Sequence, residues 1–519
     1  MKSFLKKTIF AWLILALVSC NGLAPEKPKI TQPNIIFILT DDMTYQDIEY
    51  MPKTQKLLGQ GGASFSQFIV TMSLCCPSRA SILRGQYPHN SGITGNNLPE
   101  GGFEKAYSTG LEKSTIAVWL QNAGYRTVLI GKYLNGYPAN ASQNYIPPGW
   151  TEWFVPAGDM RYNDSAYSGF NYLLNENGNL VQYGDQPEDY TTDVFAAKAI
   201  NFIKSNKSGQ PFFAYIAPYV PHRPSTPAPR HADLFADIQL ADKPSINEAD
   251  TGDKARFFQT FPELTPEQLD NFTQQYRRRI QSLQAVDEMV EAIYTALVDS
   301  GQIDKTYIFF ASDNGYHIGE HRLLPGKNTP FEEDIHVPLL VRGPDIQPGL
   351  VISNLASTID LAPTFAELTG VSAPDFIDGR SLAALLRQEQ VPEWRNAIYI
   401  ARGISNTNFS TSMGETASNG NLITTSSISG FISEQEPSDS LYDKAPSGQF
   451  FGMRTEKYTY IRFLNGDVEL YDNQNDPYQL ENIAPVTDLK LLKNLQLWLK
   501  NLKTCKADSC RQWDMEPTP

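Results

Sequence analysis

The sequence predicts an α/β protein with a large central sheet flanked by helices and a smaller antiparallel sheet near the C-terminus. Several continuous apolar runs are typical of strands buried on both faces, and a long segment of helical periodicity lies between two of them. Near the C-terminus, two polar-flanked strand patterns enclose an Asn-Gly turn, which indicates a hairpin. At 519 residues with 41% hydrophobic content, the chain is long enough for one large and one smaller domain.

The N-terminus has the pattern of a targeting segment. Three lysines precede an apolar run, 8–18, that is too short to span a membrane. The run ends in Leu-Val-Ser-Cys, which resembles a bacterial lipoprotein signal (1–20) with Cys20 as the lipidated residue; an ordinary cleaved secretory signal is the alternative. Residues 21–33 are interpreted as a tether. We therefore expect a secreted protein, lipid-anchored to the bacterial cell envelope at the outer membrane or in the periplasm.

The main strands are expected at four apolar runs, 34–39, 126–130, 212–217 and 306–311. The first run is followed by Asp41 and Asp42, and carboxylates at the carboxyl end of a buried strand suit a divalent cation. The clearest helix is expected within 264–300, where an apolar stripe starts at Ile280. The run 277–279, three arginines, is interpreted as a solvated face or a partner for nearby acids, with no role in chemistry.

The segment 73–92 is the one around which the chain is organised. Pro77 fits the first turn of a helix, so Cys75 is expected at the helix N-terminus, where negative charge is favoured. Arg79 lies within one turn and adds a fixed positive charge. The pattern indicates a site that holds an anion against a reactive side chain, although a buried cysteine beside a structural arginine is the alternative.

These residues resemble a known family. Cys-x-Pro-Ser-Arg followed by Ala-Ser-Ile-Leu-x-Gly (75–85) resembles the signature of the type I sulfatases, and the Cys75-Cys76 doublet with 85–90 is similar to the N-acetylglucosamine-6-sulfatase and heparan endosulfatase branch. The resemblance runs from Asn34 to about Asn482. It implies an alkaline-phosphatase-like mixed sheet in a catalytic domain, 34–390, and an antiparallel C-terminal subdomain, 391–519. It also implies that a maturation enzyme converts Cys75 to formylglycine, the catalytic aldehyde.

The resemblance further implies the roles of four residues that lie downstream. Lys132, in Gly-Lys-Tyr-Leu-Asn, is expected to contact the sulfate and the formylglycine, and Lys327 to bind the sulfate. His222 is expected to contact the sulfate or to protonate the leaving oxygen, with His317 facing the substrate. Many sulfatases have a histidine two residues after the lysine that corresponds to Lys132, whereas this chain has Leu134 there. Asn135 is a possible substitute for that histidine.

An all-oxygen metal site is expected from Asp41, Asp42, Asp313 and Asn314, completed by the modified Cys75. Oxygen ligands favour Ca²⁺, with Mg²⁺ possible. Zinc is the runner-up, because related phosphatases use it, but zinc prefers more histidine or cysteine ligands.

The predicted function is hydrolysis of sulfate esters on sulfated carbohydrate, either a glycosaminoglycan with 6-O-sulfated glucosamine or an algal polysaccharide. Two alternatives remain: a metal-dependent phosphatase or phosphodiesterase of the same fold, and a non-catalytic glycan-binding lipoprotein in which Cys75 stays a thiol. The net charge of −14 and the lack of a long basic run argue against nucleic-acid binding.

Two features near the C-terminus are left open by the sequence. Cys505 and Cys510 either close a short disulfide loop in an oxidising compartment or remain free thiols. The polar segment 404–449 is interpreted as a surface insertion or flexible loop, and its role is not indicated.

Overall fold

A ten-stranded mixed sheet forms the centre of the computed structural model, which describes residues 32–158, 165–206, 209–403 and 448–518. Strands β9, β1, β8, β4 and β5 run parallel in the middle, with antiparallel partners on both sides. In the order of the sheet, the strands are β11 (Leu350–Ile352), β2 (Ala63–Phe65), β10 (Leu339–Arg342), β9 (Thr306–Ser312), β1 (Asn34–Thr40), β8 (Phe212–Ala217), β4 (Arg126–Gly131), β5 (Glu152–Pro156), β6 (Leu173–Glu176) and β7 (Asn179–Gln182). Strands β3 (Phe68–Ile69) and β12 (Ala356–Ser357) pair separately.

The four predicted strands are confirmed as β1, β4, β8 and β9, three of them one residue longer than expected. Side chains of β1 alternate between two hydrophobic cores: Ile35 and Phe37 belong to one, and Ile36 and Ile38 to the other. Because successive side chains of a strand point to opposite faces, a strand covered on both sides needs a continuous apolar run.

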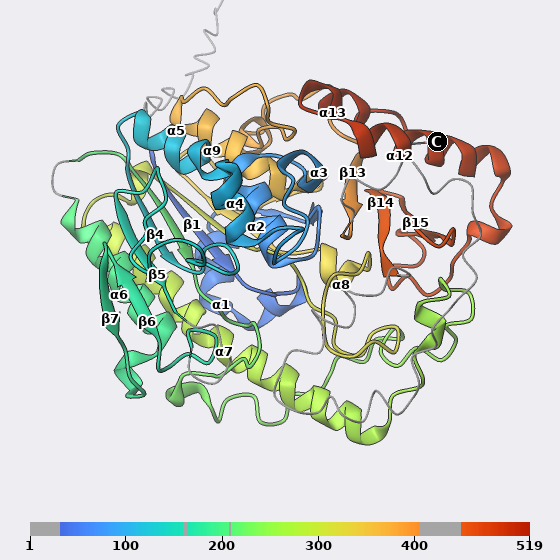
Figure 1. Cartoon of the computed structure of the whole chain (residues 1–519), viewed down its shortest axis with the longest axis horizontal. Helices are drawn as coiled ribbons and strands as arrows, with labels where there is room; N and C mark the ends of the chain where they lie inside the picture. Colours follow the sequence, from blue (N-terminus) through green and yellow to red (C-terminus); the bar gives the residue numbers. More distant parts are fainter. Residues whose placement is uncertain (1–31, 159–164, 207–208, 404–447, 519) are drawn as a thin grey trace, which may run out of the picture. The chain divides into compact units, whose positions relative to one another are not determined.

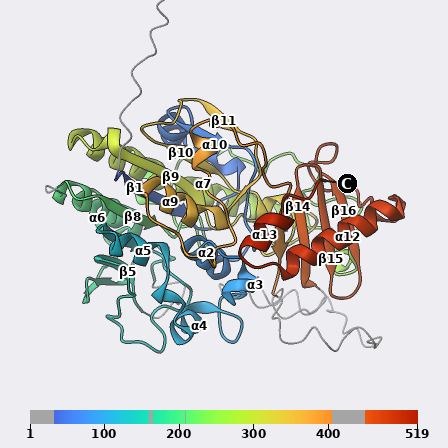
Figure 2. The ribbon, with the colours of Figure 1, turned by 90° about the horizontal axis from the view of Figure 1, so that it is seen from above.

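Helices cover both faces of the sheet, as Figures 1 and 2 show. One core includes residues of α2 (Cys75–Arg84), α5 (Ile116–Asn122) and α9 (Leu361–Thr369), and the opposite core includes α6 (Thr191–Ser205) and α7 (Pro266–Asp299). The other helices are α1 (Pro52–Thr54), α3 (Pro88–Ser91), α4 (Gly102–Thr109), α8 (Glu332–Ile335), α10 (Ala383–Leu386), α12 (Leu489–Thr504) and α13 (Asp508–Trp513).

Helix α7 is the long helix that the apolar stripe predicted. It begins at a capping box, in which Thr265 accepts from the Gln268 N–H and the Gln268 side chain accepts from the Thr265 N–H. Of the two interpretations of the arginine run, pairing with an acid is confirmed at Arg279, which is 1% exposed and lies 3.2 Å from Asp47. Arg277 is half-buried, and Arg278 is exposed, as expected of a solvated face.

A four-stranded antiparallel sheet lies near the C-terminus, as the hairpin pattern predicted. Its order is β13 (Ala397–Ala401), β14 (Phe450–Thr455), β15 (Tyr458–Phe463) and β16 (Val468–Asp472). Helix α12 packs on it through Leu495, Trp498 and Leu499 (Figure 1). Both sheets belong to one compact unit, Gln32–Pro519, so the boundary near residue 390 stays a prediction. Pro33, taken as the end of the tether, is buried and accepts a hydrogen bond from the Tyr125 hydroxyl.

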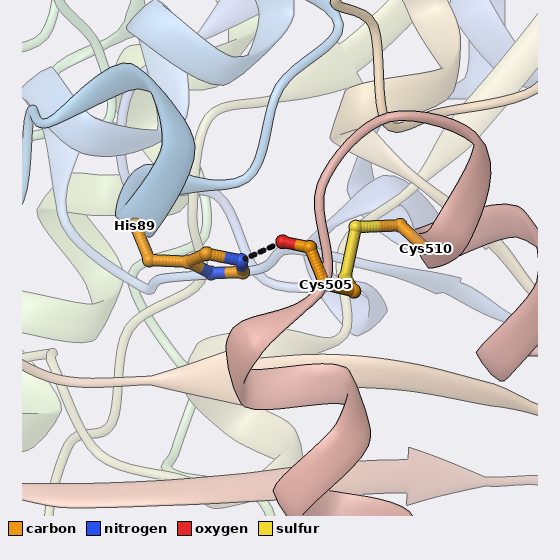
Figure 3. Close-up of side chains that lie close together, drawn as sticks. All are labelled: His89, Cys505 and Cys510. Carbon is orange, nitrogen blue, oxygen red and sulfur yellow. Dashed lines mark hydrogen bonds between the residues drawn. A yellow bond between two sulfur atoms is a disulfide. The ribbon is translucent and has the colours of Figure 1, made fainter.

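A disulfide joins Cys505 to Cys510, which resolves the alternative that the sequence left open. Figure 3 shows the imidazole of His89 directed at the carbonyl of Cys505, to which its Nε2–H donates at 3.0 Å. Asn90 donates to the same carbonyl, and Asp378 accepts from the Ala507 N–H at 2.6 Å. These contacts tie the turn between α12 and α13 to α3, through His89 and Asn90, and to the segment that follows α9, through Asp378.

Several predicted features lie outside the described residues: the signal and Cys20, the tether through residue 31, and 404–447 of the polar insertion. Among the helices that the structure describes, none combines the length and apolar character that crossing a membrane requires.

Candidate active site

The candidate site lies at the carboxyl edge of the parallel strands. Asp41 and Asp42 follow β1, Lys132 follows β4, and Asp313 and Asn314 follow β9. The register pairs Thr40 with Ser312 and Gly131 with Ala217, so these strands end at the same level and their following residues meet. His222 comes five residues after β8, where Asp41 bridges to the adjacent Pro221. All of these residues are nearly inaccessible to solvent.

Helix α2 begins at Cys75 and brings two predicted residues to this edge. The Cys75 thiol lies 3.5 Å from Oδ1 of Asp41 and accepts from Nζ of Lys327 at 3.0 Å. Arg79, one turn later, donates through Nε to Asp313 at 2.8 Å and through Nη1 to the Lys132 carbonyl at 3.1 Å. The prediction that Cys75 stands at a helix N-terminus beside a fixed positive charge is therefore correct.

Each lysine binds one of the paired carboxylates. Lys132 donates to Asp41, and Lys327 donates to both oxygens of Asp42 at 2.7 and 3.0 Å. Burial opposes ionisation of both acids, but the surrounding cations outweigh it and hold the pKa of each carboxyl below its ordinary value. Burial and the charge of Asp41 instead raise the pKa of the Cys75 thiol well above its usual range, so the unmodified residue is a neutral thiol.

His222 faces the same cluster with one defined tautomer. Its Nδ1 lies 2.7 Å from the Arg223 carbonyl, which can only accept, so Nδ1 carries the proton in the neutral ring. Its Nε2 lies 3.7 Å from Asp42. Burial lowers the pKa of His222 to about 4 despite the neighbouring aspartates, so the ring is neutral at physiological pH.

The residues present fit a hard divalent cation. Ligand atoms of Asp41, Asp42, Cys75 and His222 all lie within 4.8 Å of one another. Asn314 donates through Nδ2 to Asp42 at 2.6 Å, while its buried Oδ1 has no hydrogen-bond partner in the part of the chain that the structure describes. A buried carbonyl oxygen without a donor is costly unless a cation or water satisfies it. Asp313 is adjacent to these ligand atoms, because its Oδ1 accepts from the Asp42 N–H at 3.2 Å.

His317 is held close to the loop that carries Lys327. Its backbone pairs with Gly326, and its Nδ1 lies 3.0 and 3.1 Å from the two oxygens of Asp334. Asp334 also accepts from the N–H and hydroxyl of Thr329. His317 is therefore oriented by Asp334, and its ring is fully buried.

Three further residues lie near the Lys132 side chain. Two tyrosines that sequence reasoning missed surround the ammonium: Nζ lies 5.1 Å from the ring centre of Tyr167 and 6.0 Å from that of Tyr219. Tyr167 also packs on His222, at 4.6 Å between ring centres. Asn135, the possible substitute for the missing histidine, has a buried side-chain oxygen without a partner among the described residues, and it lines a small cavity beside Lys132.

Comparison with known proteins identifies the family. Residues 33–371 match the family model described as Sulfatase. The extracellular sulfatase SULF-1 homologue of Drosophila melanogaster is 39% identical over 364 residues, covering 68% of this chain and 31% of that protein. Human N-acetylglucosamine-6-sulfatase is 32% identical over 514 residues, covering 96% of this chain and 90% of that protein. The chain thus spans about a third of the first relative and most of the second.

A solved structure confirms the fold class. A protein in complex with its substrate D-glucosamine-2-N,6-O-disulfate superposes with a TM-score of 0.71 at 23% identity, covering 94% of this chain and all of that one. Its alkaline-phosphatase-like architecture agrees with the mixed sheet and the separate antiparallel sheet observed here. The family model and the relatives, rather than the fold alone, define the class of protein, an ester hydrolase. More particularly, the chain belongs to the sulfatase family, which confirms the predicted enzyme class, a sulfuric ester hydrolase.

Proposed function

We propose that this chain hydrolyses sulfate esters of carbohydrate, with Cys75 converted to formylglycine by a maturation enzyme and a divalent cation, Ca²⁺ by preference, held by Asp41, Asp42, Asp313 and Asn314. The observation that carries the proposal is the placement of Cys75 Sγ among Asp41, Asp42, Lys327 and His222. When present, the hydrated aldehyde supplies a hydroxyl nucleophile, and the cation supplies positive charge against the sulfate oxygens.

The residues of the chain itself have separate tasks in this proposal. Lys132 pairs with Asp41, and Lys327 pairs with Asp42. Both ammonium groups offset negative charge on the sulfate during the reaction. Arg79 fixes Asp313 and the Lys132 backbone, so its role is to hold the geometry around Cys75. These buried donors are already fixed by hydrogen bonds, which reduces the reorganisation that the reaction requires.

The leaving sugar oxygen needs a proton, and His222 and Lys327 are the candidates to supply it. Because Nδ1–H of His222 donates to the Arg223 carbonyl, Nε2 is the atom at which a proton is gained and given. His317 is proposed to face the substrate, with Asp334 fixing its Nδ1.

For the substrate, we favour 6-O-sulfated glucosamine in a glycosaminoglycan such as heparan sulfate. Support comes from the name of the human relative and from the substrate in the solved structure of the same fold. A sulfated algal polysaccharide is the alternative, because the residues of the site bind the sulfate rather than the sugar. Secretion is proposed from the leader pattern and from the extracellular relative; lipidation of Cys20 stays a prediction.

The test is sulfate release from three substrate sets: 6-sulfated N-acetylglucosamine, heparan fragments and algal sulfated oligosaccharides, with a phosphate monoester and diester alongside. Release from the glucosamine and heparan sets supports the proposal. Release from the algal set alone rejects the glycosaminoglycan assignment, and turnover of phosphate esters alone favours the phosphatase alternative.

A further inference from the structure

Arg279, in α7, is buried although its side chain is charged. The sequence indicates no chemical role for the arginine run to which it belongs. Its side chain is 1% exposed, whereas in the same run Arg277 is half-buried and Arg278 is exposed. Removing a guanidinium from water costs several kcal/mol unless the charge is paired and its donors are used. The contacts of Arg279 should therefore indicate which part of the structure its buried charge stabilises.

Those contacts all lead to the residues beside the candidate site. Nη2 donates to the Asp42 carbonyl at 2.5 Å and to Asp47 at 3.2 Å, and Nη1 donates to the Pro221 carbonyl at 3.4 Å. The guanidinium also lies 4.5 Å from the ring centre of Tyr316. Asp42 is a proposed metal ligand, and Pro221 and Tyr316 directly precede His222 and His317. Arg279 thus joins the loops that follow β1, β8 and β9 without entering the reacting cluster.

The backbone of Asp42 explains why such a tie is needed. Asp42 has φ of +68°, in the left-handed region that is strained for a residue with a Cβ. In this conformation the Asp42 carbonyl meets Arg279 while its carboxylate meets Lys327 and Asn314. Loss of the carbonyl contact removes one of the interactions that hold the strained conformation, and relaxation would move the carboxylate.

We propose that Arg279 is a positioning residue, which holds Asp42 in its strained conformation and fixes the Pro221–His222 turn beside it, so that the metal ligand and the histidine face the same point. The inference rests on the proposed function of the site. Arg279 acts through the two backbone carbonyls, since no contact joins it to Cys75 or to either lysine among the interactions of the described residues.

The test compares Arg279→Met and Arg279→Lys with Arg277→Met, a matched change in the same run whose arginine donates to the Ile238 carbonyl, away from the site. Three quantities are measured on the full chain: kcat and KM for sulfate release, Ca²⁺ affinity by calorimetry after chelation, and the midpoint of thermal unfolding. For Arg279→Met we expect roughly 10- to 100-fold losses of both kcat and Ca²⁺ affinity, as for other partners of metal ligands, with a smaller change in KM. Arg279→Lys keeps the charge and should recover part of both, and Arg277→Met should match the wild type.

The outcomes of these measurements decide whether Arg279 positions the site. A folded Arg279→Met protein with wild-type kcat and Ca²⁺ affinity overturns the inference, as does an equal loss in Arg277→Met. If the methionine variant does not fold, Arg279→Lys decides by the same comparison. Absence of sulfate release from the wild type would reject the proposed function instead, and the Ca²⁺ titration would still test the positioning role.

Discussion

Lys327 Nζ lies 3.0 Å from the Sγ of Cys75, although 252 positions separate the two residues in the chain. The same ammonium binds both oxygens of Asp42, so one lysine touches the proposed nucleophile position and the proposed metal site at once. A cation in this position stabilises the negative charge that develops as the sulfate is attacked. Changes to the nucleophile position, the metal or the nearby histidine should therefore each affect turnover.

Replacement of the two adjacent cysteines should give opposite results. Cys75→Ala should fold but lose roughly 10³- to 10⁶-fold in kcat, because the precursor of the nucleophile is removed. Cys76→Ala should keep most activity, since its buried side chain belongs to the hydrophobic core and its N–H donates to Asn96. Sulfate release and thermal unfolding measure both variants. Equal losses of activity would mean that the wrong cysteine has been assigned.

Metal removal should abolish turnover reversibly. Chelation should inactivate the enzyme, and Ca²⁺ should restore activity better than Zn²⁺, because the proposed ligands are carboxylate and amide oxygens. The measurement is sulfate release after dialysis against a chelator and stepwise addition of each ion. Restoration by zinc alone would favour the phosphatase-like alternative.

Two buried histidines offer a matched comparison. His222→Asn should lower kcat by roughly 10²- to 10⁴-fold if His222 takes part in proton transfer. His231→Asn should leave kcat within a few-fold of the wild type, because His231 is similarly buried but pairs with Glu288 on α7. Similar kcat values for the two variants would remove His222 from the proposed chemistry.

The disulfide junction should contribute a pH-dependent stability through His89 (Figure 3). Burial lowers the pKa of His89 from 6.5 to about 4, so the unfolded chain binds a proton that the folded chain does not between these values. The titration of His89 therefore does not change the free energy of unfolding above about pH 6.5, and it lowers that free energy progressively as the pH falls towards 4. Relative to His89→Gln, which does not titrate, the wild type should lose about 2–3 kcal/mol of unfolding free energy between neutral pH and about pH 4.5. Parallel stability curves for the two proteins would contradict this.

Most of the fold could be predicted because burial on both faces leaves a simple signal. The runs that became β1, β4, β8 and β9 are continuous apolar segments, and the polar residues after them meet because parallel strands end at one edge. Disulfide formation between Cys505 and Cys510 could not be predicted, because it depends on the distance between residues and not on their spacing in the chain.

Arg279 shows what sequence reasoning overlooked. From the sequence, Arg279 is interpreted together with the two neighbouring arginines because all three are charged. Arg279 nevertheless stands four and seven positions before the core residues Leu283 and Val286. That spacing places it on the buried face of the helix and is enough to predict its burial. Its acceptors, however, are the carbonyls of Asp42 and Pro221, and no residue pattern indicates which backbone groups a buried arginine will reach.

The most direct measurement is the mass of the peptide that contains Cys75, isolated from protein made in its native host. Formylglycine replaces the thiol by an aldehyde, so we predict a peptide that has lost sulfur and two hydrogens and gained one oxygen at position 75, with Cys76 unchanged. A peptide whose Cys75 is an intact thiol throughout would contradict the proposed mechanism and favour a non-catalytic role for the site.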